Sequence, residues 1–224
     1  MGGSSLWAMS SLHEVLVELF QSRPVLAVEL LAESFQYQVP AYEQVECAPE
    51  LYEGAPAEFR ADVAVVLRVK QNQPVLGVAV DVQLRPDEDK QRMWPAVLGL
   101  VIDRLHCASV LLVVSPSAAV ARWCATPIHL GHPGFTLKPL VLGPDQVPVV
   151  TDPDLARQHP ERAMLSAIMH SEHPERDQIF RSLLTALDDH DDGTRYADLV
   201  LAALPATARV RLEALMTTGT RIQP

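Results

Sequence analysis

Cysteine is scarce in this 224-residue chain, which has three, at Cys47, Cys107 and Cys124. Their number is odd and no two stand at CxxC spacing, so neither a disulfide framework nor a structural zinc site is expected. No uninterrupted run of roughly 18 apolar residues exists, and no membrane-spanning helix is therefore predicted. Residues 1–10 are too short and too uncharged for a secretory signal. We expect a flexible leader there and a reducing, cytoplasmic setting.

Short motifs of several enzyme classes are also missing. The chain has no Walker A, GxGxxG or GxSxG sequence, which leaves nucleotide-triphosphate, dinucleotide and triad-hydrolase functions without support. Positive charge is limited, because 18 lysines and arginines face 28 acidic residues and the net charge is −10. This balance argues against a protein that coats nucleic acid nonspecifically, but not against an enzyme with a locally basic cleft.

The elements that are present indicate an α/β fold. Apolar periodicity predicts helices from Ser11 onward and from Val25 to Ser34. Two strands follow as a hairpin within residues 61–84. The acidic "RPDEDK" then predicts the start of a helix that reaches Leu105. The β-branched run "SVLLVVS" is typical of a buried central strand, and "SAAVARWCA" of another helix.

The second half of the chain changes from extended to helical character. Residues 126–153 are rich in proline and glycine, with "TLKPLVLG" and "VPVV" as short extended pieces. Helices are predicted beyond them at residues 154–169, 175–188, 195–203 and 206–216. We therefore expect a mixed β-sheet flanked by helices in residues 11–153. A helical C-terminal region, 154–224, would pack on that core.

Two aspartates stand where the hairpin "ADVAVVLRVKQNQPVLGVAVDVQL" should be apolar. Strand side chains alternate faces, so Asp81 and Gln83 share one. If the chain turns at residues 71 and 72, Asp62 lies opposite Asp81, with β-carbons about 5 Å apart. Two carboxylates this close need a cation between them, and Mg²⁺ or Mn²⁺ with water ligands would serve. Alternatively, the two aspartates simply begin and end their strands in solvent, and a one-residue slip would separate them.

An aspartate on one strand and acid–x–Gln on the next resembles the PD-(D/E)XK nuclease superfamily, in particular its transposase-like, recombination-promoting nuclease branch. The segments "SLHEVLVELFQSRPVLAVELL", "VDVQLRPDEDKQRMWPAVL", "LLVVSPSAAVARW" and "YADLVLAALPATARVRLEALM" are similar to bacterial members of that branch. The likeness covers residues 11–216. It implies a restriction-endonuclease-like fold and a Mg²⁺-dependent endonuclease that hydrolyses DNA phosphodiester bonds, linked to mobile elements or phage defence.

The resemblance also assigns residues to the core of the site. Asp62 and Asp81 would bind the metal, and Gln83 would stand where the superfamily has a lysine that orients the attacking water. Aspartate at position 81 is one methylene shorter than the glutamate that this branch usually has. Gln83 is neutral and can position water but not act as a general base.

Further residues are assigned to neighbouring helices. Glu14 would be the helical acid of the metal shell, with Glu18, one turn further on, as its rival. Lys90 would face the scissile phosphate. Trp94 and Trp123 stand beside apolar residues in predicted helices and are expected in the core.

A second class of function is compatible with the same residues. A degenerate nuclease fold without catalysis could serve as a protein-interaction or dimerisation scaffold, and a homodimer fits either function. The acidic net charge and Asp81 favour this alternative, whereas the pattern of Asp62, Asp81 and Gln83 favours the enzyme. Sequence does not separate DNA from RNA as the substrate.

Overall fold

The computed structural model describes residues 3–188 and 190–219 of the chain. They form two compact units, one made of residues 17–146 and the other of residues 3–16 together with 147–188 and 190–219. Helix α1, Gly3–Ser22, begins inside the stretch expected to be a flexible leader and contributes residues to both units. The boundary between the units falls after residue 146, whereas the sequence placed it after residue 153.

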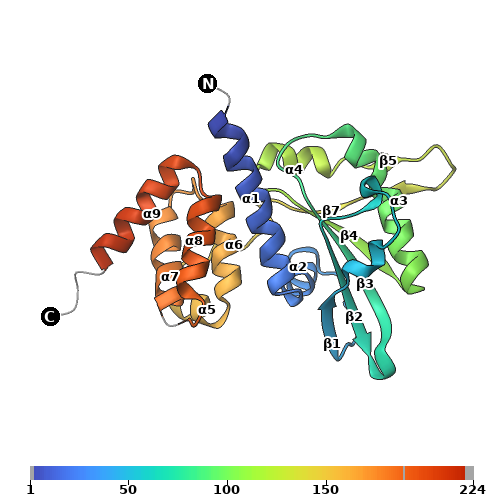
Figure 1. The fold of residues 1–224 in the computed structure, drawn as a ribbon, viewed down its shortest axis with the longest axis horizontal. Coiled ribbons are helices and arrows are strands. Elements are labelled where there is room, and N and C mark those ends of the chain that lie inside the picture. Colours follow the sequence, from blue (N-terminus) through green and yellow to red (C-terminus); the bar gives the residue numbers. More distant parts are fainter. Residues whose placement is uncertain (1–2, 189, 220–224) are drawn as a thin grey trace. The chain divides into compact units, whose positions relative to one another are not determined.

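A five-stranded mixed sheet forms the centre of the first unit (Figure 1). Strands β1, β2 and β3 pair antiparallel, and β4 and β7 continue the sheet in parallel with β3. The mixed α/β class predicted from the sequence is therefore confirmed. The strands are Gln44–Cys47 (β1), Val63–Val69 (β2), Gln73–Val82 (β3), Ser109–Val114 (β4) and Leu140–Leu142 (β7).

The two faces of this sheet are covered by different helices (Figure 1). Helix α2, Val25–Phe35, and the end of α1 lie on one face, and helices α3, Glu88–Leu105, and α4, Ala118–Cys124, lie on the other. Both faces are apolar over most of their area because the central strands are built almost entirely of valine, leucine and alanine.

Helix α3 is held close to the sheet by its sequence. Its N-cap residue, Asp87, accepts a hydrogen bond from the backbone N–H of Lys90 at 3.0 Å, which fixes the start of the helix. Trp94, Val97, Val101 and Leu105 recur every three or four residues and are buried. On the strand beneath them, a Cβ added at Gly77 would lie 2.7–2.8 Å from the Leu105 and Val101 side chains, so the helix approaches because this residue has none.

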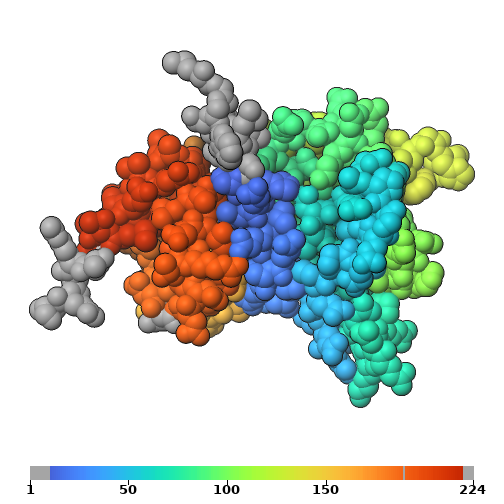
Figure 2. Space-filling view, viewed as in Figure 1, coloured from blue at the N-terminus to red at the C-terminus, as the bar shows by residue number. Residues whose placement is uncertain are grey.

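The hairpin β2–β3 turns where the sequence predicted it. Residues Lys70–Asn72 form a short 3₁₀ turn (η3), in which Gln71 and Asn72 have φ of 63° and 62°, the left-handed conformation used in tight hairpins. The turn end projects from its unit, as the teal atoms at the lower edge of Figure 2 show. A second, small hairpin was not predicted; it pairs β5, Ile128–His129, with β6, Thr136–Leu137.

The second unit is helical in residues 153–219. The predicted helix 154–169 is in fact two, α5, Pro153–Gln158, and α6, Pro160–Met169, because Pro160 starts a new helix. The "VPVV" segment is not a strand. The remaining helices are Arg176–Asp188 (α7), Gly193–Ala203 (α8) and Ala206–Gly219 (α9). None of the helices in the described part of the chain has the length and apolar character that crossing a membrane requires.

Candidate functional site

The two hairpin aspartates lie opposite each other, in the register that the sequence predicted. Val63 pairs with Val80 at the end of the β2–β3 ladder. Asp62 immediately precedes β2, in a bend, and continuing this register by one residue brings it level with Asp81. This is the end of the hairpin away from its turn. Both side chains belong to the face under α3, because they alternate with Val63 and Val80.

Asp81 is completely buried, with 0% of its surface exposed, and one of its oxygens is anchored by two N–H donors. The Gln83 amide donates to Asp81 Oδ2 at 2.6 Å, and the Trp94 indole donates to the same atom at 3.0 Å. Gln83 therefore orients the carboxylate itself in this structure. Asp81 Oδ1 is turned away from these donors and lies 2.8 Å from the Lys90 ammonium.

Lys90 is shared between the two aspartates. Its Nζ lies 2.8 Å from Asp81 Oδ1 and 3.5 Å from Asp62 Oδ1. The second oxygen of Asp62, Oδ2, accepts a hydrogen bond from the backbone N–H of Val82 at 2.7 Å. Each carboxylate is thus anchored through Oδ2 and presents Oδ1 to a common positive charge. For the buried Oδ1 of Asp81, the Lys90 ammonium is the compensating partner.

The protonation of this group reflects burial and charge together. Burial is the largest influence on the pKa of Asp81 and, together with the nearby charge of Asp62, raises it despite the lowering effect of Lys90. Burial alone would lower the pKa of Lys90, but the two carboxylates outweigh that effect and raise it. Lys90 therefore stays protonated at neutral pH, and the site contains a permanent cation next to a carboxyl group that is costly to ionise.

Burial and the charge of Asp81 also raise the pKa values of Tyr52 and Cys124, and neither side chain is ionised to act as a nucleophile. Burial, followed by the charges of Asp81 and Asp62, raises the pKa of Tyr52 to about 12, although the backbone N–H of Ala61 lowers it. Burial and then Asp81 raise the pKa of Cys124 to about 12. Both groups are neutral at physiological pH, which leaves the thiol unreactive.

The helical acids proposed from the sequence do not complete a metal shell. Glu14 is exposed on α1 and belongs to the other compact unit, while Glu18 is half-buried in the unit of the aspartates. The described residues contain no group of three or more His, Cys, Asp or Glu side chains that could hold a metal ion. Within that part of the chain, Asp62 and Asp81 therefore form a carboxylate pair without a third candidate ligand.

Trp94 is the site residue whose role the sequence did not reveal. It is buried, as expected, with 1% of its surface exposed, but its N–H also holds Asp81. The signal that could have found it is spacing: Trp94 lies four residues after Lys90 on α3, so both side chains share one helical face. A helix that directs Lys90 at the aspartates brings the Trp94 indole there too.

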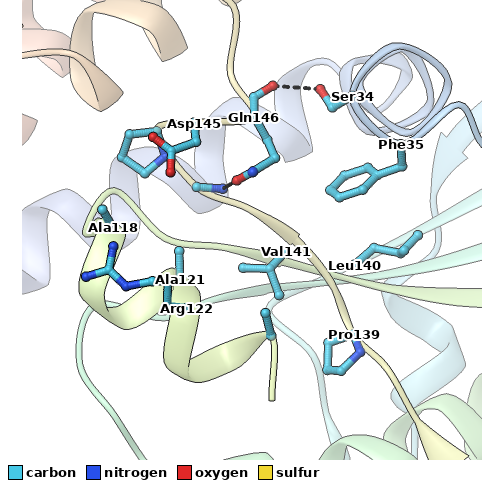
Figure 3. Close-up of a pocket in the computed structure, with 13 residues that line it drawn as sticks. Ser34, Phe35, Ala118, Ala121, Arg122, Pro139, Leu140, Val141, Asp145 and Gln146 are labelled. Atoms are coloured by element: carbon cyan, nitrogen blue, oxygen red, sulfur yellow. Dashed lines mark hydrogen bonds between the residues drawn. The ribbon is translucent and has the colours of Figure 1, made fainter. Parts of the chain in front are cut away.

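A separate pocket of about 390 Å³ lies at the edge strand of the same unit (Figure 3). It is bounded by the end of α2, by α4 and by the residues after β7, and Ser34 closes one side by donating to the Gln146 carbonyl at 2.8 Å. Its walls are largely apolar, and its charged lining residues are Arg122 and Asp145. None of the aspartate-site residues lines it.

Comparisons with protein-family models, with curated proteins and with solved structures gave no match. The likeness to the PD-(D/E)XK superfamily consequently stays a prediction that depends on the residues quoted for it.

Proposed function

We propose that this chain is a metal-dependent endonuclease of restriction-endonuclease-like architecture that hydrolyses DNA phosphodiester bonds. The observation that supports the proposal is the opposed pair Asp62 and Asp81, each with one oxygen directed at a shared cation position. The resemblance in sequence supplies the link to mobile elements or phage defence. Both aspartates stand at strand ends, where side chains from neighbouring strands can converge on a substrate group.

The residues fit a magnesium or manganese ion. Mg²⁺ is commonly bound through one or two carboxylates, with water and substrate phosphate completing its octahedron, and Asp62 and Asp81 provide two such oxygens. The Lys90 ammonium marks the point where positive charge is stabilised between them. Asp81 Oδ1 is buried with the Lys90 ammonium as its partner, so a cation already compensates the oxygen that the metal would bond. When bound, the metal would supply Lewis-acid activation of the phosphodiester and of water.

The remaining side chains would orient the Asp81 carboxylate and neutralise the charge of a scissile phosphate. Gln83 and Trp94 fix the Asp81 carboxylate through Oδ2, so that Oδ1 has one direction. Lys90 provides the positive charge available to a scissile phosphate at this site. No side chain of the site is placed as a strong general base, and slow hydrolysis is expected for that reason.

Plasmid cleavage tests the proposal. Supercoiled DNA is incubated with the protein and millimolar Mg²⁺ or Mn²⁺. We expect wild-type protein to nick the plasmid, Asp62→Asn and Asp81→Asn to lose at least about 100-fold in rate, and the exposed α3 variant Asp103→Asn to match wild type. Equal rates in all four proteins, or no cleavage by any, would refute the nuclease. Labelled RNA in parallel identifies the substrate class.

A non-catalytic scaffold is the second candidate, and one observation favours it. Lys90 fills the space between the aspartates and the Asp81 side chain is 1% exposed, an arrangement that a permanent structural ion pair would also give. A scaffold requires no divalent metal. Calorimetric titration of wild-type protein with Mn²⁺ separates the two, because binding that Asp81→Asn abolishes is expected of the enzyme alone.

A further inference from the structure

We propose that Lys90 is an internal cation that competes with the divalent metal for Asp62 and Asp81, so that the metal binds only when the lysine side chain swings out. The inference rests on the proposed function in taking the metal site to lie at the two aspartates. It goes beyond that function because, in the metal-free protein, the Lys90 side chain occupies the position that the metal would take.

The two cations would use the same oxygens. Oδ2 of Asp81 is occupied by Gln83 and Trp94, and Oδ2 of Asp62 by the Val82 backbone N–H. Oδ1 of each aspartate is the oxygen that faces Lys90. A metal ion bonded to these atoms would replace the ammonium there.

The two cations cannot share the gap. Mg²⁺ binds carboxylate oxygen at about 2.1 Å, and Nζ already lies 2.8 Å from one of the two oxygens. The centres of the ammonium and the metal would then be within about 5 Å in a partly buried site, where repulsion between like charges is strong. Occupancy by one therefore excludes the other.

Lys90 has room to leave without disturbing the helix. Its side chain is 31% exposed, whereas its backbone N–H is tied to the Asp87 cap. The adjacent first-turn residues Glu88 and Asp89 are exposed and acidic. An outward-turned ammonium would thus remain near negative charge.

Calorimetric titration with Mn²⁺ tests the competition. Lys90→Met keeps the length of the side chain and removes its charge, leaving two aspartates that repel each other until a cation binds. We expect the variant to bind Mn²⁺ at least about tenfold more tightly than wild type. The control is Arg92→Gln, which removes a positive charge two residues away on the same helix, where Arg92 pairs with the exposed Asp89. It should bind as wild type does.

Equal Mn²⁺ affinity in Lys90→Met and wild type, or weaker affinity in the variant, overturns the inference. If the variant folds only when Mn²⁺ is present, the competition is supported, because the metal then replaces the lost ammonium. Failure to fold in both conditions overturns it, since the metal would not have taken the lysine's place. Lys90→Arg, which keeps the charge, should retain weak, wild-type binding.

Wild-type protein provides a second measurement that needs no variant. The chain has three lysines, and Lys70 and Lys138 are exposed while Lys90 is paired. We expect an amine-reactive reagent to modify Lys90 slowly in metal-free protein and at least about fivefold faster with saturating Mn²⁺, relative to the other two by mass spectrometry. An unchanged or slower rate at Lys90, with metal bound, overturns the proposal.

The two proposals fail in different ways. Tighter Mn²⁺ binding by Lys90→Met without plasmid cleavage by any protein would refute the nuclease and support the competition. Cleavage by wild type with equal metal affinity in both proteins would do the reverse.

Discussion

The two faces of the central sheet are made by the same strands and differ sharply in chemistry. On the face under α2, strand β3 presents Val78, Val80 and Val82, which are 0–3% exposed. On the face under α3, the alternate positions are Gly77, Ala79 and Asp81. One face is an ordinary aliphatic core, whereas the other combines small side chains with a buried carboxylate.

The difference shows what a buried charge requires of its surroundings. Gly77 and Ala79 let α3 approach the strand, and that approach brings the Trp94 indole and the Lys90 ammonium within reach of Asp81. Valines in place of the small residues would hold α3 too far away for these contacts. The contacts of Asp81 therefore depend on the small residues Gly77 and Ala79, and the aliphatic face has no such arrangement.

A carboxylate on the aliphatic face would break the comparison most severely. Val80→Asp places a charge beside Asp81 in sequence but on the opposite side of the sheet, among buried aliphatic residues. An unpaired buried charge of this kind costs about 3–5 kcal/mol, so we expect a loss of at least about 4 kcal/mol in the free energy of unfolding, measured with urea.

Ile102→Asp is the matched control, because Ile102 is 44% exposed on α3. The same new charge at a solvated position should cost less than about 1 kcal/mol. If Val80→Asp were no more destabilising than this control, the aliphatic face would be as tolerant of charge as the α3 face, and the contrast between them would be wrong.

The close approach of α3 is tested by adding one methyl group. Gly77→Ala places a Cβ about 2.7 Å from Leu105 and Ser109, and overpacking of this kind costs about 2 kcal/mol. Gly99→Ala, on α3 itself with open space around it, should instead raise stability by about 0.5–1 kcal/mol. Urea denaturation of the two variants checks the opposite signs; a neutral Gly77→Ala would mean that the helix is not held against the strand there.

Much of the fold could be predicted because its signals are local. The turn residues located the hairpin within "ADVAVVLRVKQNQPVLGVAVDVQL", and the strand at Ser109–Val114 followed from its continuous β-branched run. The register did not follow in the same way, because a β-bulge between Leu67 and Arg68 shifts it by one residue along the hairpin. The break between α5 and α6 at Pro160 and the β5–β6 hairpin were missed. Pro160 was visible at the first place and Gly131, Pro133 and Gly134 at the second, but several conformations satisfy the same residues.

The site could be predicted only as far as the strands determine it. Alternation put Asp62 and Asp81 together, but what lies between them depends on how α3 packs over the sheet. That packing is long-range, and it makes Lys90 the counter-ion of the two aspartates, whereas the sequence predicted only that Lys90 would face a scissile phosphate. For the same reason, the sequence did not predict the role of Trp94. Its apolar neighbours indicated a core position and gave no acceptor for its N–H.

Trp94→Phe sharpens the comparison by making the α3 face more like the other. The variant keeps an aromatic ring but removes the N–H that donates to Asp81 Oδ2 at 3.0 Å. Losing a hydrogen bond to a charged group costs about 1.5–3 kcal/mol, and we expect the lower value because Gln83 still donates to that oxygen. Trp123→Phe, the edge-to-face neighbour of Trp94, should cost less. A larger loss for Trp123 would show that ring packing, not the Asp81 contact, matters here.

The smallest expected effect is a pH dependence of stability. It tests whether burial or the charge of Lys90 has the larger influence on the pKa of Asp81. The pKa of Asp81 is raised by burial above its ordinary 3.8, so the folded protein binds this proton more tightly than the unfolded chain. Stability from this group is then present below pH 3.8 and falls as pH rises through the folded pKa. The free energy of unfolding falls by about 1.4 kcal/mol for each tenfold by which folding increases the proton affinity of Asp81.

Urea unfolding of wild type and Asp81→Asn, measured at several values between about pH 4 and pH 7, checks this expectation. The free energy of unfolding of wild type should fall relative to that of Asp81→Asn as pH increases. A difference that moved in its favour would mean that Lys90 outweighs burial. Asp81 would then be an ordinary salt-bridged carboxylate, and a metal ion would have to displace a far stronger partner.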